Sequence, residues 1–266
     1  LFNNLVMATA AAAVLLGTLY PLLLDAIGGG KVSVGPPFFN TVFIPLMVPM
    51  IAAMAVGPLL AWKRGDLKPA LNRLWTAMGA ALLAVLGVWA VVGGGSILGP
   101  VGIGLAAWLF VGTLVQLAER IRLFHGPLID SLGRLWRLPR STWGLTLGHA
   151  GLALAIAGIT GAGTWKVESI QVMIPGQTVT VAGYDYTFQG AEDVRGPNYV
   201  AARGTFVVHQ DGKPVVTLYP EKRVYQVQGQ PTTEAGIHTM VSGDLYAVIG
   251  DPSGDQGGFV TRLYFN

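Results

Sequence analysis

Five long apolar stretches fill the N-terminal part of the chain, and they constrain its fold more than any other feature. They cover approximately residues 4–27, 41–62, 74–94, 98–118 and 143–163. Each is close to the length of about 20 mainly apolar residues that a helix needs to cross a bilayer. The sequence therefore predicts a polytopic α-helical membrane protein with about five spanning helices.

The composition changes after residue 163. Only 12% of all residues are charged, against about 25% in soluble domains, and the shortage falls on residues 1–163. Residues 164–266 read as a small antiparallel β-rich domain, with strands expected at 167–174, 178–181, 184–189, 200–209, 215–219, 223–227, 245–249 and 258–265. The pair Asp211-Gly212 between two of these runs predicts a hairpin. We expect two domains, a transmembrane region over 1–163 and the β-rich domain over 164–266.

Basic residues indicate how the chain is oriented. The segment 63–73 carries Lys63, Arg64, Lys68 and Arg73, and the segment 119–142 carries five arginines, whereas the intervening loops hold only Lys31. Basic loops stay on the cytoplasmic side, so the loop 28–40 and the β-rich domain are expected on the periplasmic side. Tryptophans near predicted helix ends suit an interfacial belt, namely Trp62, Trp75, Trp136, Trp143 and Trp165, whereas Trp89 and Trp108 are expected to pack inside the bundle.

Several function classes find no support in the residues. A formal net charge of +3 is too small to indicate nucleic-acid binding, and the absence of cysteine excludes disulfides and thiolate metal sites. Neither a glycine-rich phosphate loop nor a zinc-protease motif is present. A transporter of haem or of a small organic ion remains an alternative, since Pro45, Pro49 and Gly57-Pro58 suggest broken helices.

His149 is the sharpest single feature of the sequence. It lies within the last apolar stretch, and an ionisable residue inside a spanning helix is a functional-site hypothesis by default. Gly144, Gly148 and Gly151 surround it, and such small residues either let another helix approach or leave room for a macrocycle beside an axial imidazole. From the residues alone, a metal ligand and a structural histidine remain equally open.

The other candidates favour structural roles. His125 is expected in the basic loop and His209 on a surface strand, while His238 could pair with Glu234 at helical spacing. The run Tyr219-Pro-Glu221-Lys222-Arg223 suggests a solvated strand end. The loop that ends in Pro36-Pro37-Phe38-Phe39-Asn40 reads as a rigid connector with an aromatic anchor, or as a wall that faces a ligand or partner.

Several runs, in order along the chain, resemble the CcmF family of cytochrome c-type biogenesis proteins. They are Val14-Leu-Leu-Gly17-Thr-Leu-Tyr-Pro21, Ser33-Val-Gly35-Pro-Pro-Phe-Phe-Asn40, Gly57-Pro58-Leu-Leu, Trp143-Gly with Gly148-His149, Gly196-Pro197-Asn198-Tyr199, Tyr219-Pro-Glu221-Lys222-Arg223, Thr232-Thr-Glu234-Ala, Asp244-Leu-Tyr246 and Arg262-Leu-Tyr264. Each run is weak by itself, whereas their joint occurrence is specific.

The resemblance implies a multi-pass subunit of a haem lyase in the bacterial cytoplasmic (inner) membrane. Such a protein receives haem from a haem chaperone and helps attach it to apocytochrome c on the periplasmic side, together with other cytochrome c maturation subunits. It holds b-type haem in the bilayer between transmembrane histidines, and His149 matches one of these axial ligands to the haem iron.

The same resemblance implies that this chain lacks sequence features that members of the family carry. The family's Trp-rich haem-handling motif and its second b-haem ligand lie N-terminal to the region that this chain matches, and the chain starts at Leu1 inside an apolar segment. We therefore expect a C-terminal fragment that is catalytically incomplete alone. A non-catalytic assembly scaffold, in which the β-rich domain docks partner subunits, remains a further alternative.

Overall fold

A computed structural model describes residues 1–30, 32–60, 67–92, 97–123, 125–227, 229, 231–254 and 257–266. The chain divides into two compact units, Leu1–Gly161 and Ala162–Asn266, which are considered separately below. Lys31, Trp62, Lys63 and Arg64, which entered the predictions of orientation and of the aromatic belt, lie outside the described residues.

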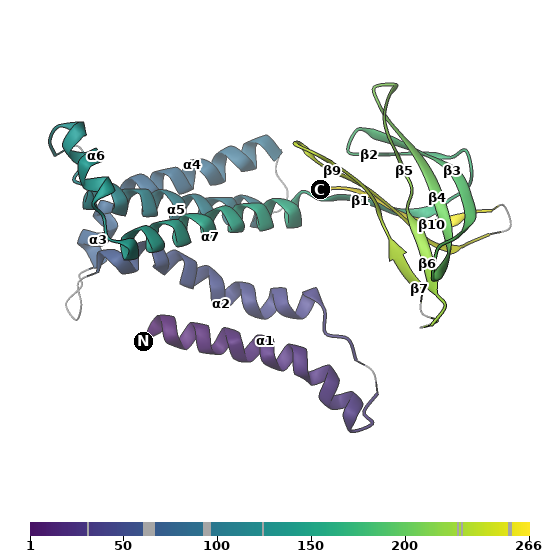
Figure 1. Cartoon of the computed structure of the whole chain (residues 1–266). Helices are drawn as coiled ribbons and strands as arrows, with labels where there is room; N and C mark the ends of the chain where they lie inside the picture. The colour runs from purple at the N-terminus through teal and green to yellow at the C-terminus, as the bar shows by residue number, and fades with distance from the viewer. Residues whose placement is uncertain are drawn as a thin grey trace. The chain divides into compact units, whose positions relative to one another are not determined.

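Five helices in the described part of the chain are long and apolar enough to cross a membrane. They are α1 (Phe2–Ala26), α2 (Pro36–Val56, continued by the short 3-10 helix Gly57–Leu59), α4 (Trp75–Val92), α5 (Leu98–Arg120) and α7 (Arg140–Thr164) (Figure 1). The prediction of a five-helix membrane protein followed by a β-rich domain is thereby confirmed.

Both basic segments contain a short helix that the sequence did not predict. Helix α3 (Leu67–Arg73) precedes α4, and helix α6 (Leu128–Trp136) lies between α5 and α7. Both are shorter than the run of about 12 residues that an isolated helix needs in water. Their stability therefore depends on packing against neighbouring helices, which sequence periodicity does not report.

Helix α2 begins at Pro36, not at residue 41 as the sequence suggested. Proline suits the first turn of a helix, where its missing N–H would have no partner. This places Phe38 and Phe39 on the first turn of α2, against Gly17 of α1: a Cβ added at Gly17 would lie 2.6 Å from a Phe38 ring carbon and 3.0 Å from one of Phe39. The aromatic pair is thus an anchor between α1 and α2.

Two side chains of α5 tie it to α2. The Trp108 indole donates a hydrogen bond of 2.9 Å to the carbonyl of Ala52, and the Gln116 amide donates one of 2.7 Å to that of Ala55. The helical core around these contacts consists of small and aliphatic residues, Ile51, Ala55, Leu74, Ala77, Leu109 and Ala153. Trp89, by contrast, is 49% exposed, so the expectation that it packs inside the bundle was wrong.

Helix α2 also continues across Pro45 and Pro49. The expectation of a helix broken at these prolines was therefore wrong. Prolines are tolerated in membrane helices because neighbouring groups satisfy the freed carbonyls. At Gly57-Pro58, by contrast, the α-helix ends at Val56 and passes into a 3-10 turn, so the transporter alternative keeps this one of its two features.

The second unit is a sandwich of two antiparallel sheets. One sheet has the order β1-β10-β9-β8 and the other the order β2-β3-β4-β6-β7, with β5 also paired to β4. The strands are β1 (Val167–Met173), β2 (Thr178–Val181), β3 (Tyr184–Arg195), β4 (Tyr199–Gln210), β5 (Lys213–Leu218), β6 (Glu221–Tyr225), β7 (Pro231–Glu234), β8 (Gly236–Met240), β9 (Gly243–Pro252) and β10 (Phe259–Phe265).

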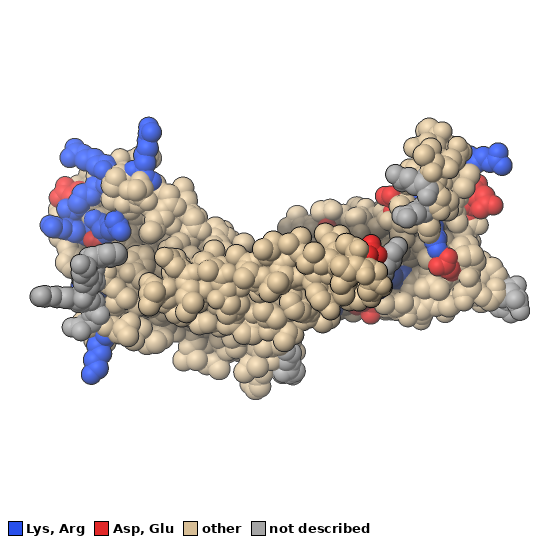
Figure 2. Space-filling view, turned by 90° about the horizontal axis from the view of Figure 1, so that it is seen from below, with Lys and Arg blue, Asp and Glu red and all other residues tan. Residues whose placement is uncertain are grey.

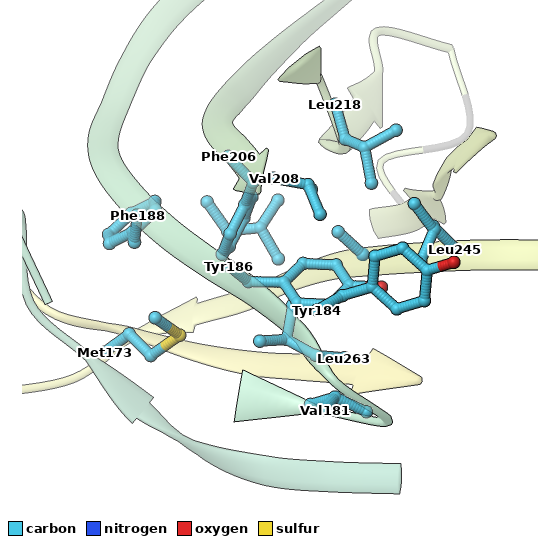
Figure 3. Close-up of a cluster of buried hydrophobic side chains, with 12 residues drawn as sticks. Met173, Val181, Tyr184, Tyr186, Phe188, Phe206, Val208, Leu218, Leu245 and Leu263 are labelled. Carbon is cyan, nitrogen blue, oxygen red and sulfur yellow. The ribbon is translucent and has the colours of Figure 1, made fainter. Parts of the chain in front are cut away.

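Alternating side chains from both sheets meet in one core (Figure 3). Tyr186, Phe188 and Phe206 are its largest fully buried members, and the Phe188 and Phe206 rings lie 5.0 Å apart. The predicted hairpin at Asp211-Gly212 is confirmed, because Gln210 pairs with Lys213 and both turn residues have positive φ.

Strands β7 and β8 were not predicted, and their presence corrects one site hypothesis. Glu234 ends β7 in one sheet, while His238 lies in β8 of the other sheet, where it is opposite Leu245. The segment is extended, so helical spacing does not bring these two side chains together. Polar threonines and one glycine gave these short strands no clear alternating pattern.

Candidate functional site

His149 lies on the side of α7 that faces the helical core. Thr142, Thr146, His149 and Ala153 recur at spacings of four, three and four residues, which places them on one side of a helix. Thr142, Thr146 and Ala153 are all buried, and Ala153 belongs to the helical core. Thr142 also accepts a hydrogen bond of 3.3 Å from Arg120 of α5.

The imidazole of His149 is half-buried and lacks a partner on one side. Its Nδ1 atom is buried and has no hydrogen bond to any described residue. A buried polar atom without a partner is costly and calls for an explanation. The contacts among the described residues therefore assign no structural role to Nδ1 of His149.

The glycines of α7 border open space. Gly148 directly precedes His149, whereas Gly144 and Gly151 lie on the side of the helix away from it, and a Cβ added to any of the three would meet no atom within 4 Å beyond its chain neighbours. Open space therefore borders all three glycines, and the expectation that they leave room for a planar group beside the imidazole stays a prediction. They form a smooth face of α7 that no described residue covers closely.

None of the other three histidines lies in a spanning helix. His125 is exposed in the loop after α5, and its Nδ1 lies 3.1 Å from the Leu123 carbonyl oxygen. His209 belongs to β4 and is opposite Asp185, and His238 belongs to β8. Across the described ranges, no cluster of three or more His, Asp or Glu side chains could hold a metal ion.

A second polar site, which the sequence did not predict, lies in the β-sandwich around Glu221. Its side chain is 6% exposed, and it accepts a hydrogen bond of 2.6 Å from Arg203 Nε and one of 2.7 Å from Arg223 Nε. Burial by itself would raise the pKa of this carboxyl, but the hydrogen bonds from Arg223 and Arg203 outweigh it and lower the pKa.

Arg223 and Lys222 are therefore not the solvated strand end that the sequence suggested. The Arg223 guanidinium lies 4.4 Å from the centroid of the Tyr199 ring and 3.9 Å from Glu234 of β7. Its pKa is raised, chiefly by the hydrogen bond to Glu221. Lys222 forms an ion pair with Asp251 of the other sheet. Only strand register reveals this network, because Arg203 lies directly opposite Glu221 in the β4–β6 pair.

Both units of the chain are similar to known proteins. Residues 164–266 match the family model described as "CcmF C-terminal beta-sandwich". This range covers the β-rich part of the chain with the sandwich described above.

Similarity extends to the helices. The chain is 44% identical over 263 residues to the cytochrome c-type biogenesis protein CycK of Rhizobium meliloti, covering 99% of the chain and 39% of that protein. It is 36% identical to the cytochrome c-type biogenesis protein CcmF of Escherichia coli over 266 residues, covering 100% of the chain and 39% of that protein.

A solved structure named "Cytochrome c Heme Lyase CcmF" has the same fold, with a TM-score of 0.71 at 22% identity, and the match covers 99% of this chain and 41% of that one. The chain thus spans about two-fifths of the length of the relatives it matches. On these matches, the chain belongs to the CcmF family of cytochrome c-type biogenesis proteins.

Proposed function

We propose that the chain forms part of the membrane subunit of a haem lyase for c-type cytochrome maturation, and that His149 is an axial ligand of b-type haem in the bilayer. Relatives named for cytochrome c-type biogenesis, at 36–44% identity over nearly the whole chain, support the process. The observation that carries the site is the buried Nδ1 atom of His149, which has no hydrogen-bond partner among the described residues.

The imidazole of His149 is chemically suited to be an axial ligand of haem iron. A neutral imidazole can give one ring nitrogen to iron, and no described residue already holds the Nδ1 atom of His149 by a hydrogen bond. The stripe formed by Thr142, Thr146 and Ala153 fixes the side of α7 from which the ring projects. A b-type haem with two axial imidazoles supplies one-electron redox chemistry, suited to reducing the iron of an incoming haem.

This chain would supply one of the two ligands. In the part of the chain that the structure describes, the other histidines lie in the loop after α5 and in the β-sandwich, not in a spanning helix. The second imidazole would therefore come from a segment of the subunit that corresponds to the three-fifths of the relatives outside the match. A bis-histidine site made in this way joins α7 to the rest of the subunit.

The proposed orientation places the β-sandwich in the periplasm and the loops of α3 and α6 in the cytoplasm of the bacterial inner membrane. Lys68 and Arg73 lie on α3, and Arg122, Arg134 and Arg137 lie between α5 and α7. This distribution follows the positive-inside rule. The sandwich would then stand where haem is attached to apocytochrome c and where a haem chaperone and other maturation subunits dock.

A visible spectrum tests the haem ligand directly. In the purified full-length protein, His149→Ala is expected to lose the b-type Soret band or to retain less haem, because one axial bond to iron is removed. Added imidazole should restore part of the band, since the truncated side chain leaves space for a free ligand. His125→Ala is the matched control, and it should keep the wild-type spectrum.

An unchanged Soret band and full haem retention in His149→Ala would refute the ligand assignment. A loss of haem in both His149→Ala and His125→Ala would point to general instability instead of ligation. The scaffold role of the β-sandwich is tested separately by deleting residues 168–262. If this variant keeps its haem spectrum but no longer co-purifies with partner subunits, docking belongs to the sandwich.

A further inference from the structure

Helix α6 carries an apolar stripe that none of the described residues covers. Leu128, Ile129, Leu132 and Trp136 are 64%, 73%, 51% and 84% exposed. At 3.6 residues per turn, these four positions fall within about 100° of arc on one side of the helix. Four large apolar side chains on one side of a nine-residue helix are unusual for a surface that faces water.

The other side of α6 is fixed to the end of α5. Ser131 is fully buried and its hydroxyl donates a hydrogen bond of 3.3 Å to the Arg122 carbonyl, while Arg134 Nε donates one of 2.8 Å to the Ile121 carbonyl. Arg134 also donates a bond of 3.2 Å to Ser131. These contacts satisfy the carbonyls of the two residues that directly follow α5. They hold α6 in one orientation, with its apolar stripe turned away from α5.

The position of α6 in the chain places it at a membrane surface. It connects α5, which ends at Arg120, to α7, which begins at Arg140, and both of these helices are long and apolar enough to span a bilayer. Figure 2 shows that Lys and Arg side chains gather at this end of the helical unit, while the surface along the middle of the helices is largely uncharged.

The charge around the stripe is strongly basic. Arg122, Arg137 and Arg140 are exposed beside α6. The nearby carboxylates are Asp130 on α6 and Glu119 at the end of α5, and Glu119 already pairs with Arg73 at 3.7 Å. Arginines beside an exposed apolar stripe complement the anionic headgroups that lie above the acyl chains of a bilayer.

We propose that α6 is an in-plane interfacial helix, which buries Leu128, Ile129, Leu132 and Trp136 at the headgroup–acyl boundary while the flanking arginines bind anionic lipid phosphates. Tryptophan is enriched at this boundary because its ring is apolar and its N–H is polar. The occupant of the stripe is thus the leaflet that surrounds α5 and α7. This role does not depend on haem binding.

An anchored α6 fixes the depth of α7 in the bilayer. Only Arg137, Leu138 and Pro139 separate the end of α6 from the first residue of α7. His149 lies nine residues after Arg140, which corresponds to about 14 Å along a helix. The interfacial helix would therefore set the level at which the imidazole sits below the basic membrane surface.

Spin labels measure whether the stripe is in lipid. The chain contains no cysteine, so Leu132→Cys and Asp130→Cys give two labelling sites in the full-length protein once any cysteine elsewhere is replaced by serine. Asp130 is exposed on another side of α6 and is the matched control. In proteoliposomes of phosphatidylcholine and phosphatidylglycerol, the label at 132 should collide with oxygen more than with a water-soluble nickel chelate. The label at 130 should show the reverse.

Two results would overturn the lipid assignment. Equal access of the nickel chelate to both labels would mean that the stripe faces water. A label at 132 that is inaccessible to both oxygen and the chelate would mean that another protein segment covers it.

The arginine contribution is tested in the same experiment. Changing from phosphatidylcholine alone to the mixture with phosphatidylglycerol should move the label at 132 deeper, and Arg137→Gln should reduce that change. A depth that is independent of phosphatidylglycerol would refute the role of the arginines in binding anionic headgroups.

Discussion

Arg203 and Glu221 lie directly opposite each other on β4 and β6, and Nε and Nη2 of the arginine both lie 2.6 Å from the same carboxylate oxygen, Oε1. The other oxygen, Oε2, accepts the hydrogen bond from Arg223. One buried carboxylate thus stabilises two arginines at the junction of β4 and β6. Removing its charge would leave Arg203 without the carboxylate that it pairs with, and would leave Arg223 only the longer contact of 3.9 Å with Glu234.

Glu221→Gln is expected to destabilise the β-sandwich by about 1–3 kcal/mol. The cost is below that of a fully buried pair because the two arginine side chains are 34% and 27% exposed. Urea unfolding, or hydrogen exchange of the β4 and β6 amides in the full chain, would measure it. Asp193→Asn, at an exposed position of β3 that lies opposite Ala202, should change stability by less than about 0.5 kcal/mol. Equal effects of the two changes would contradict a special role for Glu221.

The same carboxylate makes the stability of the sandwich depend on pH. Because the pKa of Glu221 is lower in the folded state than its ordinary value of 4.5, the folded state binds this proton more weakly than the unfolded state does. The stabilisation is therefore complete above about pH 4.5 and is lost as the pH falls through the folded-state pKa. Unfolding curves between pH 6 and about pH 3 should show this loss in the wild type and a smaller one in Glu221→Gln. Parallel curves would exclude Glu221 as the source.

Gly17→Ala is expected to weaken the contact between α1 and α2. The added Cβ would lie 2.6 Å and 3.0 Å from the rings of Phe38 and Phe39, and overpacking of this kind costs about 1–3 kcal/mol. Thermal denaturation of the detergent-solubilised protein would report the loss. Gly79→Ala in α4 is the control, because its Cβ meets no atom within 4 Å. That change should be neutral or stabilising, since alanine favours a helix. A neutral Gly17→Ala would show that the two helices separate without cost.

Trp108→Phe should loosen the contact between α5 and α2. It removes the hydrogen bond to the Ala52 carbonyl, with an expected loss of about 0.5–1.5 kcal/mol. Trp89→Phe, at a ring that is 49% exposed, changes the same residue type without removing a hydrogen bond to a described residue. Comparing the two variants by thermal denaturation separates the lost bond from the smaller ring. Equal shifts in melting temperature would contradict the prediction.

Local sequence was sufficient for the features that depend on short-range physics. Long apolar stretches predicted five spanning helices because a buried backbone in lipid must form its own hydrogen bonds. The Asp211-Gly212 pair predicted its hairpin because both residues tolerate positive φ. His149 stood out because an ionisable side chain in an apolar helix is costly.

Tertiary structure alone decided which groups meet. The Arg203–Glu221 pair depends on the register of two strands, and residues 18 apart in the chain carry no local sign of it. The directions of His149 and of the α7 glycines depend on which side of the helix packs against the core. Helix α6 forms because Ser131 and Arg134 bond to the end of α5. Sequence thus determined the elements, whereas packing and register, which are long-range, determined the partners.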